Sequence, residues 1–186
     1  MTPILGIMAS QISGHLTTPN NYESISTTTL SSTASDVTFS SIPATYKHLQ
    51  LRFMSTQSSG GSLFYIQLNA DTGSNYAWHE LNTTGAASAT YSGSSVGYIK
   101  IFGRNVGTGG SANPTSGILD ILDYTSTTKT KTTRSIVGQS SNGSGELDFM
   151  SGLWFATPAA INSIKIYTHD STNMTTNTSF ALYGVK

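Results

Sequence analysis

The feature that most constrains this chain is that no window of it is suited to a long helix. Two of the three longest stretches without Gly or Pro, Asn20–Ile42 and Ile118–Val137, consist largely of Ser, Thr and β-branched residues. Such side chains either compete with a helix for backbone hydrogen bonds or lose rotamer freedom in it. We therefore expect the core to be built from β-strands.

Short β-branched or aromatic runs recur after Tyr22, separated by Gly, Pro, Asn and Ser clusters at spacings of about 8–12 residues. In one run Leu49, Leu51 and Phe53 alternate with polar residues, which is typical of a strand with one buried face. Eight to eleven short strands without helices predict an all-β fold, a jelly roll or a related antiparallel β-sandwich. The predicted strands are Tyr46–Ser55, Leu63–Asn69, Val96–Phe102, Ile118–Tyr124, Arg134–Gln139, Glu146–Phe155, Ile161–Thr168 and Ser179–Lys186, with weaker signals at Tyr22–Leu30, Val37–Ser41 and Tyr76–Leu81.

The surface must draw its polarity from uncharged groups, because only 10% of the residues are charged and 9 Lys and Arg balance 9 Asp and Glu. Ser and Thr make up 57 of the 186 residues, which supplies that polarity. A neutral chain offers no electrostatic footprint for nucleic acid or an anionic membrane, and no apolar run approaches the ~20 residues that cross a bilayer. The absence of Cys excludes disulfides and thiolate metal sites. We expect no nucleic acid, membrane or cofactor as a partner.

The first sixteen residues differ from the rest because their hydrophobic residues outnumber their hydroxyls. A secretory signal is disfavoured, since no Lys or Arg precedes the apolar stretch and both Pro and Gly interrupt it. Two interpretations remain open, a first strand or packed tail of the domain and an extended arm that docks on a neighbouring subunit. We divide the chain into an N-terminal arm, residues 1–16, and a β-sandwich domain, residues 17–186. The residues expected to bind a partner are Ile4, Leu5, Ile7, Met8 and Ile12.

Two carboxylates form the one pair with a separation suited to catalysis. Glu146 and Asp148 are two residues apart, so on a strand they share a face at about 6.6 Å. That distance overlaps the roughly 6.5–9.5 Å between the carboxyl groups of inverting glycosidases. The alternation favours a different interpretation, in which both carboxylates face solvent and Leu147 and Phe149 lie on the opposite, buried face.

Two further segments offer weaker candidates for binding. Asn69, Asp71 and Glu80 imitate positions of a calcium loop, but the Gly is misplaced, and these residues are also ordinary for a turn. Trp78 beside His79 could form a sugar-binding platform, although a Trp among strands is usually part of the core. We therefore predict a turn at the first segment and a buried Trp78 at the second.

Three cations lie close together between threonines at Lys129, Lys131 and Arg134. They could contact a phosphate or a glycan. In a neutral chain three cations make a weak patch, and charge at an exposed hairpin also deters edge-to-edge pairing of strands. We favour the solvated hairpin.

Four phrases of the sequence resemble small β-rich virion proteins of tailed bacteriophages. They are SIPATYKHLQLRF at residues 41–53, NYAWHEL at 75–81, SIKIY at 163–167 and SFALYGVK at 179–186, and the opening PILGIMASQISGHL is similar to the N-terminal arms of such proteins. The resemblance implies a jelly-roll fold, trimeric assembly and a role as a capsid decoration (cement) protein or as a fibre or receptor-binding module. It carries no functional residues with it.

Together these features predict a non-enzymatic virion protein that decorates the capsid and bridges capsomers. We expect a homotrimer that contacts the major capsid protein or other virion subunits, is assembled in the host cytoplasm and is located on the capsid surface. The alternative is a tail or head fibre or a receptor-binding module that recognises host surface glycans. A third hypothesis is a glycan hydrolase that uses Glu146 and Asp148.

Overall fold

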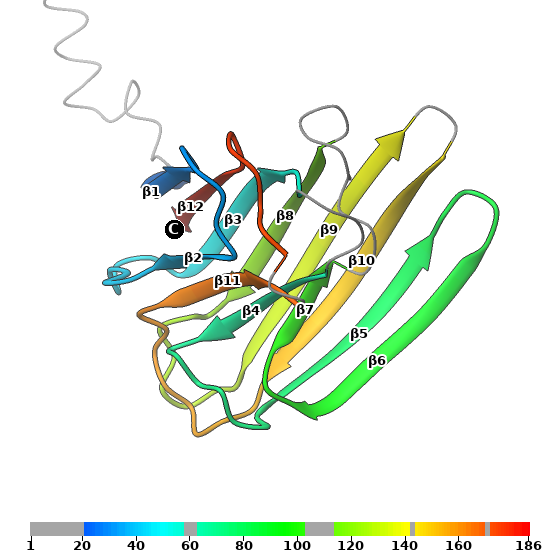
Figure 1. Ribbon diagram of the computed structural model, residues 1–186. Coiled ribbons are helices and arrows are strands. Elements are labelled where there is room, and N and C mark those ends of the chain that lie inside the picture. Colours follow the sequence, from blue (N-terminus) through cyan, green and yellow to red (C-terminus); the bar gives the residue numbers. More distant parts are fainter. Residues whose placement is uncertain (1–20, 58–62, 103–113, 142–143, 170–171) are drawn as a thin grey trace, which may run out of the picture.

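The computed structural model describes residues 21–57, 63–102, 114–141, 144–169 and 172–186, which contain twelve strands and no helix. Eight strands form a large sheet in the order β1-β12-β3-β8-β9-β10-β5-β6 (Figure 1). Their bounds are β1 Tyr22–Thr29, β12 Ser179–Val185, β3 His48–Ser55, β8 Thr115–Leu122, β9 Lys131–Ser141, β10 Ser144–Trp154, β5 Tyr76–Thr83 and β6 Ser88–Val96.

The other four strands form a small sheet in the order β2-β11-β4-β7 that covers one face of the large sheet (Figure 1). Their bounds are β2 Asp36–Phe39, β11 Ile164–Thr168, β4 Phe64–Leu68 and β7 Ile99–Phe102. Every strand pair is antiparallel. The predicted all-β, antiparallel sandwich is therefore confirmed. Within the described residues no helix is long and apolar enough to cross a membrane.

The core lies between the two sheets and follows the predicted alternation of side chains. On β3, Leu49, Leu51 and Phe53 all face the interior. Phe53 stacks on Phe180 of β12 at 5.7 Å between ring centroids and meets Phe64 of β4 edge-to-face at 5.8 Å. Because these aromatic contacts join both sheets, they fix how the small sheet sits on the large one.

Two glycines allow close approaches that a larger residue would block. A Cβ at Gly152 on β10 would lie 2.4 Å from Ile99 of β7 and from Thr133 of β9, so β7 packs directly against the backbone of β10. A Cβ at Gly184 on β12 would lie 2.2 Å from the ring of Tyr46. The first glycine is the one that brings the small sheet close to the middle of the large sheet.

Every predicted strand overlaps an observed one, but strand β6 was not predicted, and one predicted strand, Val96–Phe102, joined the end of β6 to β7. Strand β6 was not predicted because Ser88–Val96 is mostly Ser, Thr, Gly and Ala, with little hydrophobic alternation. The prediction of a strand at Val96–Phe102 was wrong in extent, because β6 ends at Val96 and β7 begins at Ile99 in the other sheet. Pairing with β5 stabilises β6, and a local pattern cannot report that contact.

Candidate functional site

The expected arm residues lie outside the part of the chain that the structure describes, so the candidate surfaces come from the two sheets. The first strand after the proposed arm, residues 1–16, is β1, which begins at Tyr22 and forms an edge of the large sheet. Two regions of the large sheet stand out, a group of carboxylates on its inner face and a row of hydrophobic residues on its outer face.

Glu146 and Asp148 share one face of β10 as predicted, but that face points toward the interior and not toward solvent. Asp148 is fully buried and Glu146 is partly buried, whereas Leu147 and Phe149 are exposed to solvent. The prediction that these carboxylates face solvent was therefore wrong. Strand β10 turns its acidic side chains toward the interior and its hydrophobic side chains outward.

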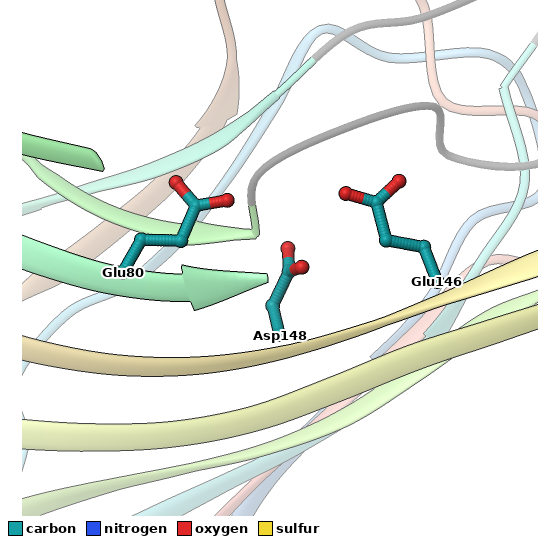
Figure 2. A group of neighbouring side chains, drawn as sticks. All are labelled: Glu80, Glu146 and Asp148. Carbon is teal, nitrogen blue, oxygen red and sulfur yellow. The ribbon is translucent and has the colours of Figure 1, made fainter. Parts of the chain in front are cut away.

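A third carboxylate joins them from the neighbouring strand. Glu80 of β5 is buried, and its carboxylate points toward those of Glu146 and Asp148 (Figure 2). One carboxylate oxygen from each of the three residues lies within 4.8 Å of the others. Sequence reasoning missed Glu80 as a member of this group, because residues far apart along the chain meet only when β5 pairs with β10.

Donors from within the protein occupy much of this acidic cluster. The ammonium of Lys100 on β7 contacts Glu80 Oε2 at 2.7 Å, and Lys100 is itself buried. The amide of Asn82 donates hydrogen bonds to Asp148 Oδ1 at 2.6 Å and to Glu146. Oxygen ligands of this kind suit hard divalent cations. The ammonium of Lys100 and the neutral amide of Asn82 already donate to these carboxylates, so the arrangement is consistent with a buried polar network that joins three strands.

The Trp78 prediction is confirmed, since the indole is buried beside this cluster. The Lys100 ammonium lies 4.9 Å from the centre of the Trp78 ring. A Cβ at Gly93 of β6 would lie 2.7 Å from the indole, so the backbone of β6 covers that part of the ring. A ring enclosed in this way does not present the open stacking surface that a sugar-binding platform needs.

The segment that imitates a calcium loop forms a turn between β4 and β5, as predicted. Asp71 accepts hydrogen bonds from the Gly73 backbone N–H at 2.8 Å and from the Trp154 indole at 2.7 Å. Although partial burial opposes the charged form, hydrogen bonds from Trp154, Asn75 and Gly73 hold the pKa of Asp71 below its ordinary value. Glu80 does not join this turn, because it belongs to the acidic cluster.

The three clustered cations do not form one patch. Lys129 is exposed and pairs with Asp123 at 3.1 Å. The ammonium of Lys131 is buried and donates to the backbone carbonyls of Ser126 and Lys129, and burial lowers the pKa of Lys131. The favoured interpretation was wrong in treating all three cations as solvated, because Lys131 is buried.

A row of hydrophobic residues crosses the outer face of the large sheet. Ile118 on β8 lies opposite Ile136 on β9, Ile136 lies opposite Phe149 on β10, and Phe149 lies opposite Leu81 on β5. Each of these four side chains is between 43% and 55% exposed. We call them the outer apolar row. Directly opposed residues have Cβ atoms about 4.5–5.5 Å apart, so the row is continuous across four strands.

Polar residues border this row at both ends. Arg52 of β3 lies opposite Ile118, and Thr90 of β6 lies opposite Leu81. A hollow on this face is lined by Leu81, Ile136 and Phe149 together with polar neighbours. Exposed apolar patches with polar borders, on the scale of ~300 Å² and above, frequently mark sites of protein interaction. No protein-family model, curated protein or solved structure matches this chain, so the candidate function rests on this geometry and on the sequence.

Proposed function

We propose that this protein is a non-enzymatic structural component of a virus particle of the tailed-phage type, and that it binds a protein partner through the outer apolar row. The observation that carries the proposal is the row itself, formed by Ile118, Ile136, Phe149 and Leu81. Four half-exposed hydrophobic side chains in register leave a continuous strip of apolar surface in contact with water in the monomer. Covering them would contribute about 25 cal/mol for each Å² of apolar surface removed from water.

The order of the strands supports assigning the sandwich to the jelly-roll class. We set aside β1, β12 and the hairpin of β8 and β9, and number the remaining eight strands from 1 to 8 along the chain. The small sheet then has the order 1-8-3-6 and the large sheet the order 2-7-4-5. These are the orders of a jelly roll, and the β8–β9 hairpin is inserted between its second and seventh strands. Jelly rolls are common in viral capsid and lectin domains.

The decoration role suits this surface better than the two alternatives do. The aromatic platform that the sequence offered for glycan recognition was Trp78, and its ring is enclosed by Gly93 and Lys100. A hydrolase would need carboxylates that a polymer can reach, and Asp148 has no exposed surface. A protein partner requires only a complementary apolar patch, which the outer apolar row supplies.

The test is binding to particles of the virus that encodes the protein. We expect the protein to cover the capsid lattice when the particles are imaged, and the Ile136→Ser, Phe149→Ser double variant to lose binding to particles that lack the protein. The matched control is Tyr22→Ser, which removes a large side chain that is 48% exposed on β1, a strand that contributes no member of the row; its ring contacts Arg52 at the border of the row. Localisation confined to the tail, or full binding by the double variant, would contradict the proposal.

The arm provides a second, independent test. Deleting residues 1–14 removes the apolar segment that we expect to reach a neighbouring subunit or the capsid shell. The truncated protein should keep its β-sheet circular dichroism and lose particle binding. A truncated protein that still decorates capsids would show that the arm is not a contact.

A further inference from the structure

The edges of the two sheets are protected to very different degrees. An edge strand exposes unpaired backbone N–H and C=O groups, and proteins usually blunt it with charge, bulges or short length. Strand β1 has a bulge between Ser24 and Ser26, and its Glu23 forms an ion pair with Lys186. Such an edge is a poor template for another strand.

The two edges of the small sheet are also blunted. Strand β2 has only four residues and carries Asp36, which pairs with Lys165 at 3.6 Å. Strand β7 also has four residues, and its pairing with β4 is interrupted by a bulge. Neither edge offers the length of regular backbone that a stable strand pair requires.

Strand β6 is the exception. It forms the outer margin of the large sheet (Figure 1), and within the described residues no strand pairs with its other side. Its nine residues, SATYSGSSV, include no charged residue and no Pro. Residues 88–94 pair one to one with β5, and the bulge falls only at Ser95. Seven consecutive residues of regular, uncharged backbone therefore lie at an open edge.

We propose that β6 pairs with β6 of a second copy of this chain, antiparallel and about a twofold axis. Because β6 has no charged residue, two copies of it can meet in any register without like-charge repulsion. A twofold contact is self-complementary, so one surface is sufficient for both partners. The other three edge strands, β1, β2 and β7, carry the bulges, charges or short lengths described above. The strand best suited to pair with β6 is therefore β6 of another copy.

The contact would also gather the binding surfaces of the two copies. In an antiparallel pair the twofold axis runs perpendicular to the sheet, so the outer faces of both large sheets point the same way. Leu81 lies on β5, the strand next to β6, and is therefore close to the proposed contact. Two outer apolar rows on one side would engage a repeating particle surface with higher avidity than one row. This consequence rests on the proposed function, whereas the strand pairing itself does not.

The mass of the full chain in solution tests the pairing. We expect sedimentation equilibrium to give twice the 19.6 kDa of one chain. In the Thr90→Lys, Ser92→Lys variant, lysines of the two copies would face each other across the new pair, so we expect a monomer with an unchanged circular dichroism spectrum. The matched control places the same change on the other edge, Thr27→Lys, Thr29→Lys on β1, and should keep the wild-type mass.

A charge-complementation experiment separates lost pairing from lost folding. We expect the Thr90→Asp, Ser92→Asp variant to be a monomer alone and to form a heterodimer when mixed with the lysine variant. A wild-type monomer, a wild-type trimer, or a lysine variant that keeps the dimer mass would each overturn the proposal. A failure of the strand pairing would leave the expected loss of particle binding in the Ile136→Ser, Phe149→Ser variant unchanged, so the two proposals fail separately.

Discussion

The inner and outer faces of the large sheet are composed in opposite ways where β10 lies beside β5. The inner face buries Asp148 and Glu80, whereas the outer face exposes Phe149 and Leu81. The ordinary arrangement would be the reverse, with hydrophobic residues inside. The comparison shows that the burial of a side chain here depends on the partners available to it, because Lys100 and Asn82 stabilise the buried carboxylates.

The strongest test of this contrast is removal of the buried cation. The Lys100→Met change leaves Glu80 buried without its ammonium partner, and we expect it to lower the free energy of unfolding by about 3–5 kcal/mol. Urea denaturation measures the loss. The matched control is Lys165→Met, whose pair with Asp36 is exposed on both sides and should contribute less than about 1 kcal/mol. Equal losses in the two variants would refute a stabilising inner network.

A second test compares one glycine from each face. We expect Gly152→Ala, on the inner face, to lower the free energy of unfolding by about 1–3 kcal/mol, because its methyl group would overlap Ile99 and Thr133. The control is Gly138→Ala on the outer face of β9, where a Cβ would meet its nearest neighbours at 3.4 Å. Thermal unfolding distinguishes them, and a Gly138 variant as unstable as the Gly152 variant would contradict the assignment of the two faces.

Acid provides a third, smaller test, at the turn next to the inner face. Hydrogen bonds hold the pKa of Asp71 below its ordinary value despite the opposing effect of burial. The folded state therefore favours the ionised carboxylate, and its contribution is present above the unfolded pKa of about 4 and is lost as the pH falls through the folded pKa. We expect the urea midpoint of the wild type to fall between pH 5 and pH 3. The Asp71→Asn variant should show a shallower fall, and an identical slope would exclude Asp71 as a source of acid sensitivity.

The smallest expected effect completes the comparison. The Ile136→Ser change removes a hydrophobic side chain from the outer apolar row, where it is 55% exposed, and we expect the free energy of unfolding to change by less than about 0.5 kcal/mol. Chemical denaturation of the isolated protein measures this value. A loss of several kcal/mol would mean that the row is already covered within the protein, and it would remove the basis for a docking surface.

Much of the fold could be predicted because strands leave a local signature. The alternation of Leu49, Leu51 and Phe53 identified β3 and its buried face, and the unfavourable helix propensity of Ser- and Thr-rich stretches excluded helices. Strand β6 left almost no such signature, since an edge strand exposed on both faces has little need of hydrophobic residues. Its place in the sheet depends on backbone pairing with β5.

The candidate surfaces were less predictable than the strands. Sequence spacing correctly placed Glu146 and Asp148 on one face, but it assigned that face to solvent because carboxylates are usually exposed. The outer apolar row was also missed, because each of its four members lies on a different strand. They become neighbours only when the strands pair, so no local stretch of sequence reveals the row. The arm residues, which the sequence did single out, remain a prediction.

The sequence by itself determined that this chain forms a hydroxyl-rich, charge-poor β-sandwich, because helix propensity and side-chain alternation act over a few residues. Only the tertiary structure decided which side of β10 became the interior, whereas the alternation on β3 had already identified its buried face. That choice depends on contacts between distant residues, such as Lys100 with Glu80 and Phe149 with Ile136, which are set by strand order and register. The alternation of side chains along a strand determines which residues share a face. Whether that face is buried depends on the residues of other strands that pack against it.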